Sequence, residues 1–121
     1  MRVVHVLTNL ELAGAQSSVA AICSGLRERG VDVRIAFGSR GGRTVGSAAP
    51  LRARLARAGV PLCDVSAMRR GPSPALDAAA LVQLIGLLRR ERPDIVHTHM
   101  SKGSALGRVA ARICRTPHVV H

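Results

Sequence analysis

The sequence predicts one α/β domain with a Rossmann-like, three-layer α/β/α architecture and a parallel sheet of about five strands in the order 3-2-1-4-5. Two observations support this fold class. Short β-branched runs alternate with longer stretches whose apolar residues recur at helical spacing. Each strand–helix–strand unit is about 30 residues long, which is typical of a βαβ unit that requires parallel pairing and right-handed crossovers. At 121 residues the chain has the length of a single domain.

The first of these units occupies residues 3–37. Val3–Leu7 is a β-branched run that predicts a strand buried on both faces. Residues 16–29 place apolar side chains along one helical face, and Gly30 ends this helix as a C′ glycine. Val31–Phe37 is the second predicted strand. The helical face that we expect to turn toward the core consists of Val19, Ile22, Cys23 and Leu26.

The second unit begins with a glycine-rich loop at residues 38–43. Pro50 suits the first turn of a short helix, because the N–H group that proline lacks has no partner there. Gly59 ends this helix, and residues 61–65 form the third predicted strand.

Two more helices and two more strands complete the predicted sheet. Ser73-Pro74 supplies an N-cap and a first residue for a helix over 75–90. A strand over 94–97 follows, then a helix capped by Ser101, and then a strand that begins at His118. The core-facing residues that we expect are Ala78, Leu81, Val82, Ile85 and Leu88 on the first of these helices, and Leu106, Val109, Ala110 and Ile113 on the second.

Composition narrows the possible functional classes. The formal net charge of +11 comes almost entirely from arginine and would suit a polyanionic partner. Phe37 is the only aromatic residue of the Phe, Trp and Tyr class, however, so the chain lacks the stacking platforms of single-strand binders. We therefore expect no nucleic-acid partner, and instead a basic surface that faces anionic lipids. The widely spaced cysteines indicate reduced thiols; they are Cys23, Cys63 and Cys114.

The sequence shows neither a signal peptide nor a stretch with the roughly 20 apolar residues of a membrane span. We therefore expect a cytoplasmic protein that lies peripherally at the inner face of the membrane. Such a location agrees with the basic composition, because the cytoplasmic leaflet is negatively charged.

Two loops that follow predicted strands are the candidate functional segments, because ligands of doubly wound sheets bind where the strand order reverses. The first loop, Asn9–Gln16, has neither the three glycines of a dinucleotide fingerprint nor a Walker sequence. Its small residues Ala13, Gly14 and Ala15 would let a phosphate or diphosphate approach the N-terminus of a helix. Alternatively, they only allow the helix to pack close to the sheet, and the residues alone do not decide between the two.

The second loop contains His97, His99, Ser101 and Lys102. His97 and His99 are two residues apart on an extended segment, so they point to the same side. We find no third ligand in the sequence and therefore expect no metal ion. We interpret His97 as a structural histidine and His99 as a polar contact to the substrate. Lys102 is the only lysine of the chain, and it is either a further contact or a solvated side chain.

These segments resemble the N-terminal domain of the retaining glycosyltransferases of family 4, which have the GT-B fold. The family has a Gly-Gly-Ala-Gln/Glu turn where this chain has Ala13–Gln16. It continues with Leu-Arg-Arg-x-Arg-Pro-Asp-Ile/Val-Val-His-x-His, matched by Leu88–His99, and with Ser-Lys-x-x-x-Leu-Gly-Arg-x-Ala-Ala-Arg, matched by Ser101–Arg112. The resemblance covers essentially the whole chain. Ala13 departs from the family glycine and adds a methyl group at the turn.

The resemblance implies a two-domain enzyme whose N-terminal half binds the acceptor and whose C-terminal half binds a nucleotide-sugar. No metal is implied, and the resemblance assigns no catalytic residue to this half. Relatives with such a segment often act on lipid-linked precursors of surface polysaccharides. The donor diphosphate would approach the turn, and the acceptor or sugar would meet the second loop. The residues implied are Ala13, Gly14, Ala15 and Gln16 for the diphosphate, and Asn9, His97, His99, Ser101 and Lys102 for the acceptor or sugar side.

We therefore expect residues 1–121 to be a single N-terminal glycosyltransferase domain, truncated before the donor-binding domain and inactive alone in hexosyl transfer. Two alternatives stay open. The chain could be one subunit of a split glycosyltransferase whose partner binds the donor. It could also be a non-catalytic Rossmann-like protein that binds a ligand or a polyanion, which predicts tight and steeply salt-dependent binding.

Overall fold

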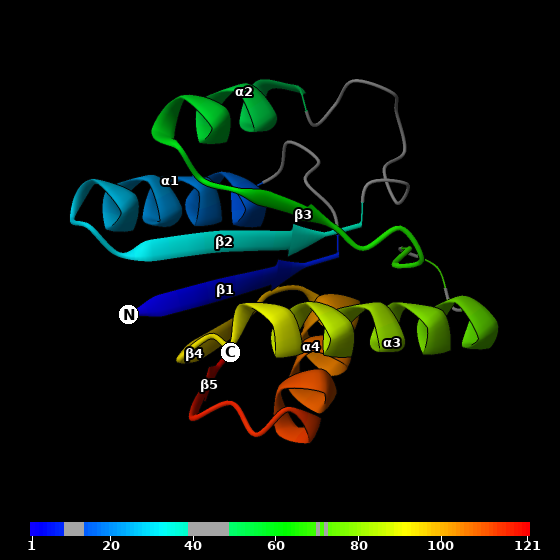
Figure 1. Ribbon diagram of the computed structural model, residues 1–121. Coiled ribbons are helices and arrows are strands. Elements are labelled where there is room, and N and C mark those ends of the chain that lie inside the picture. The colour runs from blue at the N-terminus through cyan, green and yellow to red at the C-terminus, as the bar shows by residue number, and fades with distance from the viewer. Residues whose placement is uncertain (9–13, 39–48, 70, 72) are drawn as a thin grey trace.

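The computed structural model describes residues 1–8, 14–38, 49–69, 71 and 73–121, which form a five-stranded parallel sheet with connecting helices (Figure 1). The sheet order is β3-β2-β1-β4-β5, as predicted. The strands are β1 (Arg2–Leu7), β2 (Asp32–Phe37), β3 (Leu62–Asp64), β4 (Ile95–Thr98) and β5 (His118–Val120). The helices are α1 (Gly14–Glu28), α2 (Ala49–Ala58), α3 (Pro74–Glu91) and α4 (Ser101–Ile113). The predicted Rossmann-like fold class is therefore confirmed.

Strand β1 lies at the centre of the sheet and pairs with β2 on one edge and β4 on the other. In this register Val3 lies beside Val33 of β2 and beside Ile95 of β4. The strand order reverses between β1 and β4, because β2 and β3 continue on one side and β5 on the other. The crevice that binds ligands in sheets of this kind is therefore expected outside the carboxyl ends of these two strands.

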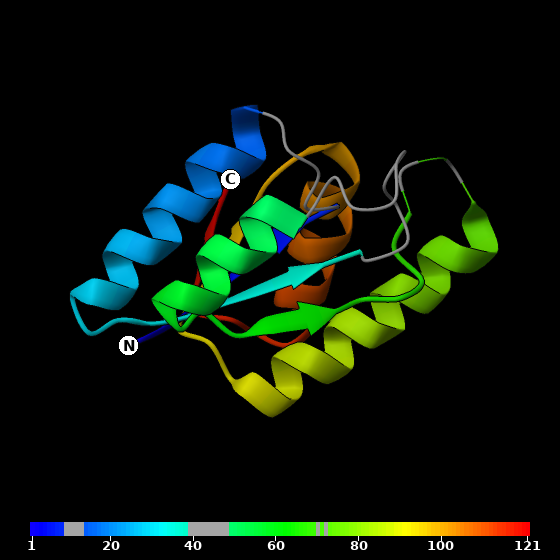
Figure 2. The same cartoon turned by 90° about the horizontal axis from the view of Figure 1, so that it is seen from above.

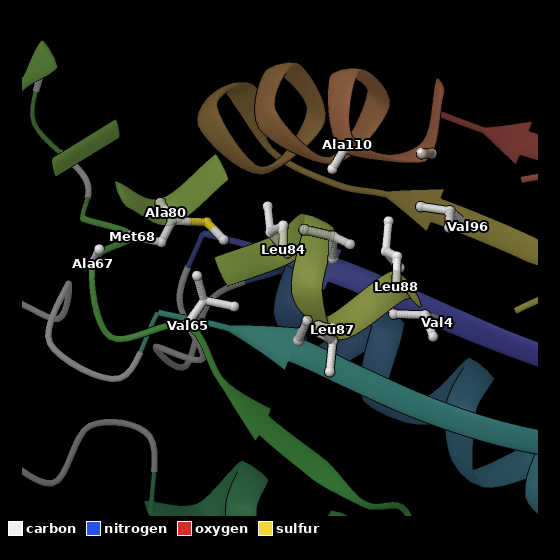
Figure 3. Packing of buried hydrophobic residues seen from close by; sticks show 13 residues of the cluster. Val4, Val65, Ala67, Met68, Ala80, Leu84, Leu87, Leu88, Val96 and Ala110 are labelled. Carbon is white, nitrogen blue, oxygen red and sulfur yellow. The ribbon is translucent and has the colours of Figure 1, made fainter. Parts of the chain in front are cut away.

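Apolar side chains form a core on each face of the sheet. One core joins Val4 of β1 and Val96 of β4 to Leu84 and Leu88 of α3 and to Ala110 of α4 (Figure 3). The other packs β1 and β2 against α1 and α2, through residues that include Leu7, Val33, Ile35, Val19 and Leu55. Figures 1 and 2 accordingly show α1 beside α2, and α3 in contact with α4. Within the described ranges, none of the helices combines the length and apolar character that crossing a membrane requires.

The expected inner face of α4 is partly wrong. Val109 and Ile113 are each 47% exposed, and small residues are buried in their place. The reason is the close approach of the helix to the sheet. A Cβ atom on Gly107 would lie 2.7 Å from Cγ2 of Thr98 and 3.3 Å from Cβ of Val6. Branched side chains do not fit into this space and turn outward; the buried residues of α4 are Gly103, Ser104, Gly107, Ala110 and Ala111.

The inner faces expected for α1 and α3 also need correction. Ile22 of α1 is 46% exposed, and Ala20 is buried beside Val19 and Cys23 instead. In α3, Val82 is 69% exposed and Ala78 is exposed as well. Periodicity did not identify the buried face, because this helix is apolar around most of its circumference between residues 78 and 88. The residues that α3 buries are Ala80, Leu84, Leu87, Leu88 and Glu91.

Candidate functional site

Three histidines gather near the carboxyl ends of β1 and β4, where the strand order reverses. His5 of β1 and His97 of β4 are partners in the parallel ladder, so their side chains leave the sheet on the same face. His99 follows β4 by one residue and lies two positions after His97. The ring centroids are 5.0 Å apart for His5 and His97, 5.3 Å for His5 and His99, and 4.1 Å for His97 and His99. We call these residues the histidine cluster.

One hydrogen bond joins two members of the histidine cluster. Nδ1 of His5 and Nε2 of His99 are 3.0 Å apart, so one of the two nitrogens donates to the other. The other ring nitrogen of His5, Nε2, is buried and has no hydrogen-bond partner among the described residues. An unpaired buried polar atom costs about 1–3 kcal/mol, so the hydrogen bonding of this ring is incomplete.

Burial keeps the histidine cluster uncharged at neutral pH. His5 is only 1% exposed, and burial together with the neighbouring imidazoles lowers its pKa to about 3. Burial also lowers the pKa of His99 to about 4, with further contributions from His97 and His121. The pKa of His97 is lowered mainly by burial and then by His121. Neutral imidazoles can donate and accept hydrogen bonds or ligate a metal ion through a lone pair.

The N-terminus of α4 is held against the end of β1. The backbone N–H of Gly103 donates to Oγ1 of Thr8 over 3.0 Å, and a Cβ atom on Gly103 would lie 3.0 Å from the backbone nitrogen of Thr8. The backbone N–H of His99 donates to the carbonyl of Val6 over 2.9 Å and extends the ladder past β4. The first turn of α4 therefore begins beside the end of β1 and directly after His99 and Met100.

The N-cap of α4 differs from the prediction. Met100 occupies the N-cap position with a φ of 68°, and Ser101 is the first helical residue rather than the cap. Ser101 is exposed. A positive φ is uncommon for a residue with a side chain, and such strain concentrates at functional sites. The turn between His99 and Ser101 is therefore a constrained part of the crevice.

Lys102 forms an ion pair rather than extending freely into solvent. Its Nζ lies 2.7 Å from Oδ1 of Asp77, a residue in the first turn of α3, and it also donates to the backbone carbonyl of Gly71. The Lys102 side chain is 13% exposed, and its hydrogen bond lowers the pKa of the Asp77 carboxyl group. Lys102 therefore ties the start of α4 to the start of α3.

The first predicted loop is described only in part. Asn9 and Ala13 lie outside the described residues. Gly14, Ala15 and Gln16 form the first turn of α1, which confirms their expected place at a helix N-terminus, and their side chains are outside the described set. This first turn follows β1, just as the first turn of α4 follows β4.

His5 is the functional candidate that the sequence analysis did not identify. It lies inside the apolar run Val3–Leu7, and we treated that run only as a buried strand. The expectation that His97 and His99 have no third imidazole near them is therefore wrong. The available signal was the predicted strand order, which places β1 next to β4 and so brings a histidine of one strand toward those of the other.

The amino ends of the strands, opposite the histidine cluster, carry charged side chains instead of neutral ones. At the amino ends of the strands, Arg2 pairs with Asp32 over 2.8 Å, and Arg34 pairs with Glu91. The hydrogen bond from Arg2 lowers the pKa of the Asp32 carboxyl group. Charged groups at the amino ends of the strands thus neutralise one another. Neutral histidines and the N-termini of helices lie at the carboxyl ends.

Comparison with known proteins identifies the family to which this chain belongs. Residues 13–121 match the family model described as "Glycosyl transferase 4-like domain". Over 57 residues the chain is 47% identical to the UDP-Gal:alpha-D-GlcNAc-diphosphoundecaprenol alpha-1,3-galactosyltransferase of Escherichia coli. That alignment covers 47% of this chain and 15% of the galactosyltransferase.

Solved structures of low sequence identity share the fold. MurG of Acinetobacter baumannii superposes with a TM-score of 0.71 at 16% identity, over 99% of this chain and 34% of MurG. Anabaena Alr3699/HepE in complex with UDP and glucose gives a TM-score of 0.67 at 16% identity, over 98% of this chain and 28% of that protein. The chain thus spans about a third or less of the length of the relatives that it matches.

Proposed function

This chain belongs to the glycosyl transferase 4-like domain family, and from that premise we propose that it is the acceptor-binding N-terminal domain of a retaining glycosyltransferase. In this proposal the complete enzyme transfers a hexose from a nucleotide-sugar to an acceptor. A C-terminal domain or a separate subunit supplies the donor site. Residues 1–121 then contain half of the active site and catalyse no transfer alone.

The observation that supports an acceptor site most directly is the position of the crevice. Two helix N-termini, those of α1 and α4, follow the two strands between which the sheet order reverses. The histidine cluster comes from the ends of these two strands; it is neutral and partly accessible, since His97 and His99 are only half-buried. Neutral imidazoles suit the hydroxyl groups of a sugar, because one ring can donate one hydrogen bond and accept another.

For the donor side we propose that the first turn of α1 approaches the diphosphate. Gly14 begins α1, so the positive end of the helix dipole lies at this point. A helix N-terminus can stabilise phosphate charge without a cation. We accordingly propose that sugar transfer by the complete enzyme requires no metal ion.

We further propose that the acceptor is a lipid-linked precursor of a surface polysaccharide. The support comes from the Escherichia coli relative, whose name specifies a diphosphoundecaprenol-linked acceptor and which is 47% identical over 57 residues. An acceptor of this kind lies in a membrane, so its enzyme must work at the membrane surface.

The outer side of α4 suits such a surface. Arg108, Arg112 and Arg115 border a shallow cavity of about 650 Å³ together with Val109 and Val119. Val109 is 47% exposed and Val119 is 43% exposed. Each arginine near an anionic bilayer contributes about 1 kcal/mol of attraction, and exposed valines can enter the headgroup region. We propose that this basic surface lies against the inner face of the cytoplasmic membrane.

Binding measurements on residues 1–121 test the acceptor assignment. We expect a soluble analogue of diphosphate-linked GlcNAc to bind, UDP-galactose alone to bind far more weakly, and the two together to give no transferred sugar. His99→Ala should weaken the binding of the analogue at least tenfold, whereas the control His118→Ala on β5 should not. Sugar transfer by the chain alone, or donor binding without acceptor binding, would contradict the proposal. Tight and steeply salt-dependent binding of a polyanion would favour the non-catalytic alternative.

A further inference from the structure

We propose that His5, His97 and His99 form a binding site for a divalent transition-metal ion of the kind that prefers imidazole, with Zn²⁺ as the representative. This site goes beyond the proposed glycosyltransferase function, which runs without a metal ion. The inference rests on the spacing of the ring nitrogens and on the way the backbone of β1 and β4 positions the three residues.

The spacing of the three rings is close to that of a zinc site. One nitrogen of each ring lies within 4.8 Å of one nitrogen of both others. Zn–N bonds of about 2.0–2.1 Å place the nitrogens of a tetrahedral site about 3.3 Å apart. Nδ1 of His5 and Nε2 of His99 are already 3.0 Å apart. The half-buried His97 has to move its ring by about an ångström or two to complete the set.

The backbone holds two of these ligands in place before an ion arrives. His5 and His97 are ladder partners on adjacent strands, and rings that project from one face of a sheet at this register start about 5 Å apart. His99 continues the same strand, and its backbone N–H is bonded to the carbonyl of Val6. Ligands on rigid strands lose little conformational entropy when an ion binds.

The hydrogen bond within the histidine cluster has to be replaced before an ion can bind there. A ligating imidazole uses the lone pair of an unprotonated ring nitrogen. Only the proton shared between Nδ1 of His5 and Nε2 of His99 has to leave the space between them. A change of tautomer in one neutral ring moves it to that ring's other nitrogen.

An ion bound through Nδ1 of His5 would not contact the other ring nitrogen of that residue, Nε2, which is buried and has no hydrogen-bond partner among the described residues. Three protein ligands would leave one coordination position open, as in catalytic zinc sites, for water or an oxyanion.

Zinc titration of residues 1–121 by isothermal calorimetry, after treatment with a chelator, tests this site. We expect one ion per chain, with affinity at least tenfold lower in His97→Asn and in His99→Asn. His118→Asn is the matched control, because His118 is an exposed histidine on the neighbouring β5. These variants avoid the buried His5, and circular dichroism must show that each remains folded. No zinc binding, or unchanged binding in both cluster variants, would overturn the proposal.

Cobalt distinguishes the histidine cluster from the three free thiols, Cys23, Cys63 and Cys114. We expect Co²⁺ bound to the wild-type chain to absorb in the visible range, without the near-ultraviolet charge-transfer band of a cobalt thiolate. A thiolate band that persists in His99→Asn would assign the ion to cysteine and overturn the proposal. Neither the zinc titration nor the cobalt spectrum depends on sugar transfer. The metal-site proposal and the glycosyltransferase proposal can therefore be refuted independently of each other.

Discussion

His5 and His97 are partners in the parallel ladder between β1 and β4, with ring centroids 5.0 Å apart on one face of the sheet. When one of two rings at this spacing is protonated, its positive charge disfavours protonation of the other and lowers the pKa of that ring. The pKa of His5 is lowered to about 3 by burial first and by the neighbouring histidines second. The stability of the folded chain should therefore depend on pH through this pair.

The first prediction concerns stability in acid. The pKa of His5 is about 3 in the folded chain and 6.5 ordinarily, so between these values the unfolded chain binds the extra proton. Stability is then fully present above pH 6.5 and decreases as the pH falls toward 3. For His5 alone the loss by pH 5 is about 2 kcal/mol. Urea unfolding at pH 7 and pH 5 measures it, and His5→Gln should reduce the difference. Equal stability at both pH values would contradict this account.

The second prediction concerns the close approach of α4 to the sheet. Gly107→Ala adds a Cβ atom 2.7 Å from Cγ2 of Thr98, so overpacking should destabilise the chain by about 1–3 kcal/mol. Gly86→Ala in α3 is the matched control, because a Cβ atom there meets no atom within 4 Å. That control should stabilise the helix by up to about 1 kcal/mol. Urea unfolding of both variants checks the opposite signs, and a neutral Gly107→Ala would show that the helix can shift away.

The third prediction concerns the ion pair of Lys102 and Asp77. Their 2.7 Å contact joins the first turns of α4 and α3, and the side chains are 13% and 30% exposed. A double-mutant cycle with Lys102→Met and Asp77→Asn should give a coupling energy of up to about 1 kcal/mol in urea unfolding. Arg108→Met, which removes an exposed cation from the same helix, should not couple to Asp77→Asn. Additive effects of Lys102→Met and Asp77→Asn would show that the contact does not contribute to stability.

The fourth prediction concerns the basic surface of α4. The double variant Arg108→Glu/Arg112→Glu should bind phosphatidylglycerol vesicles at least tenfold more weakly in a sedimentation assay, because each arginine contributes about 1 kcal/mol. Arg54→Glu/Arg57→Glu on α2 makes the same change in net charge on exposed positions elsewhere. If both double variants lose binding equally, net charge rather than this surface determines the interaction.

The fifth prediction requires a complete enzyme that contains this domain. Gly14→Leu should lower kcat/KM at least tenfold while leaving the unfolding midpoint unchanged, because a bulky side chain at the first residue of α1 blocks the approach of a diphosphate. Gly25→Ala, inside the same helix and with no atom within 4 Å of its new Cβ atom, should leave kcat/KM unchanged. Wild-type turnover in Gly14→Leu would exclude this role for the turn.

The strand order could be predicted because it depends on connectivity, and connectivity is visible in the alternation of short apolar runs and long amphipathic stretches. The inner faces of the helices could not be predicted as reliably. Helical periodicity places Ile22, Val82 and Val109 in the core, whereas the structure exposes all three. How closely a helix approaches the sheet depends on residues such as Gly107, whose contacts lie on other elements. Local periodicity contains no information about that distance.

Only part of the candidate site could be predicted from the sequence. His97 and His99 stand out because they lie at the junction between a strand and the helix after it. His5 is a single histidine within an apolar run, and its importance depends on the register between β1 and β4, two strands far apart along the chain. The constrained turn at Met100 and the pairing of Lys102 with Asp77 likewise depend on tertiary contacts.

The central position of β1 also has a consequence for the order in which the sheet forms. Val3 pairs with Val33 of β2 nearby in the chain, but its partner on the other edge, Ile95, follows only after two more helices and a strand. Closing the longer loop costs more entropy, so we expect the β4-facing edge of β1 to stay open while β1 pairs with β2. An open apolar edge invites pairing with other chains, and a polar side chain within it discourages that pairing. The β4-facing edge of β1 is therefore the part of the sheet where we expect pairing with other chains to compete with folding.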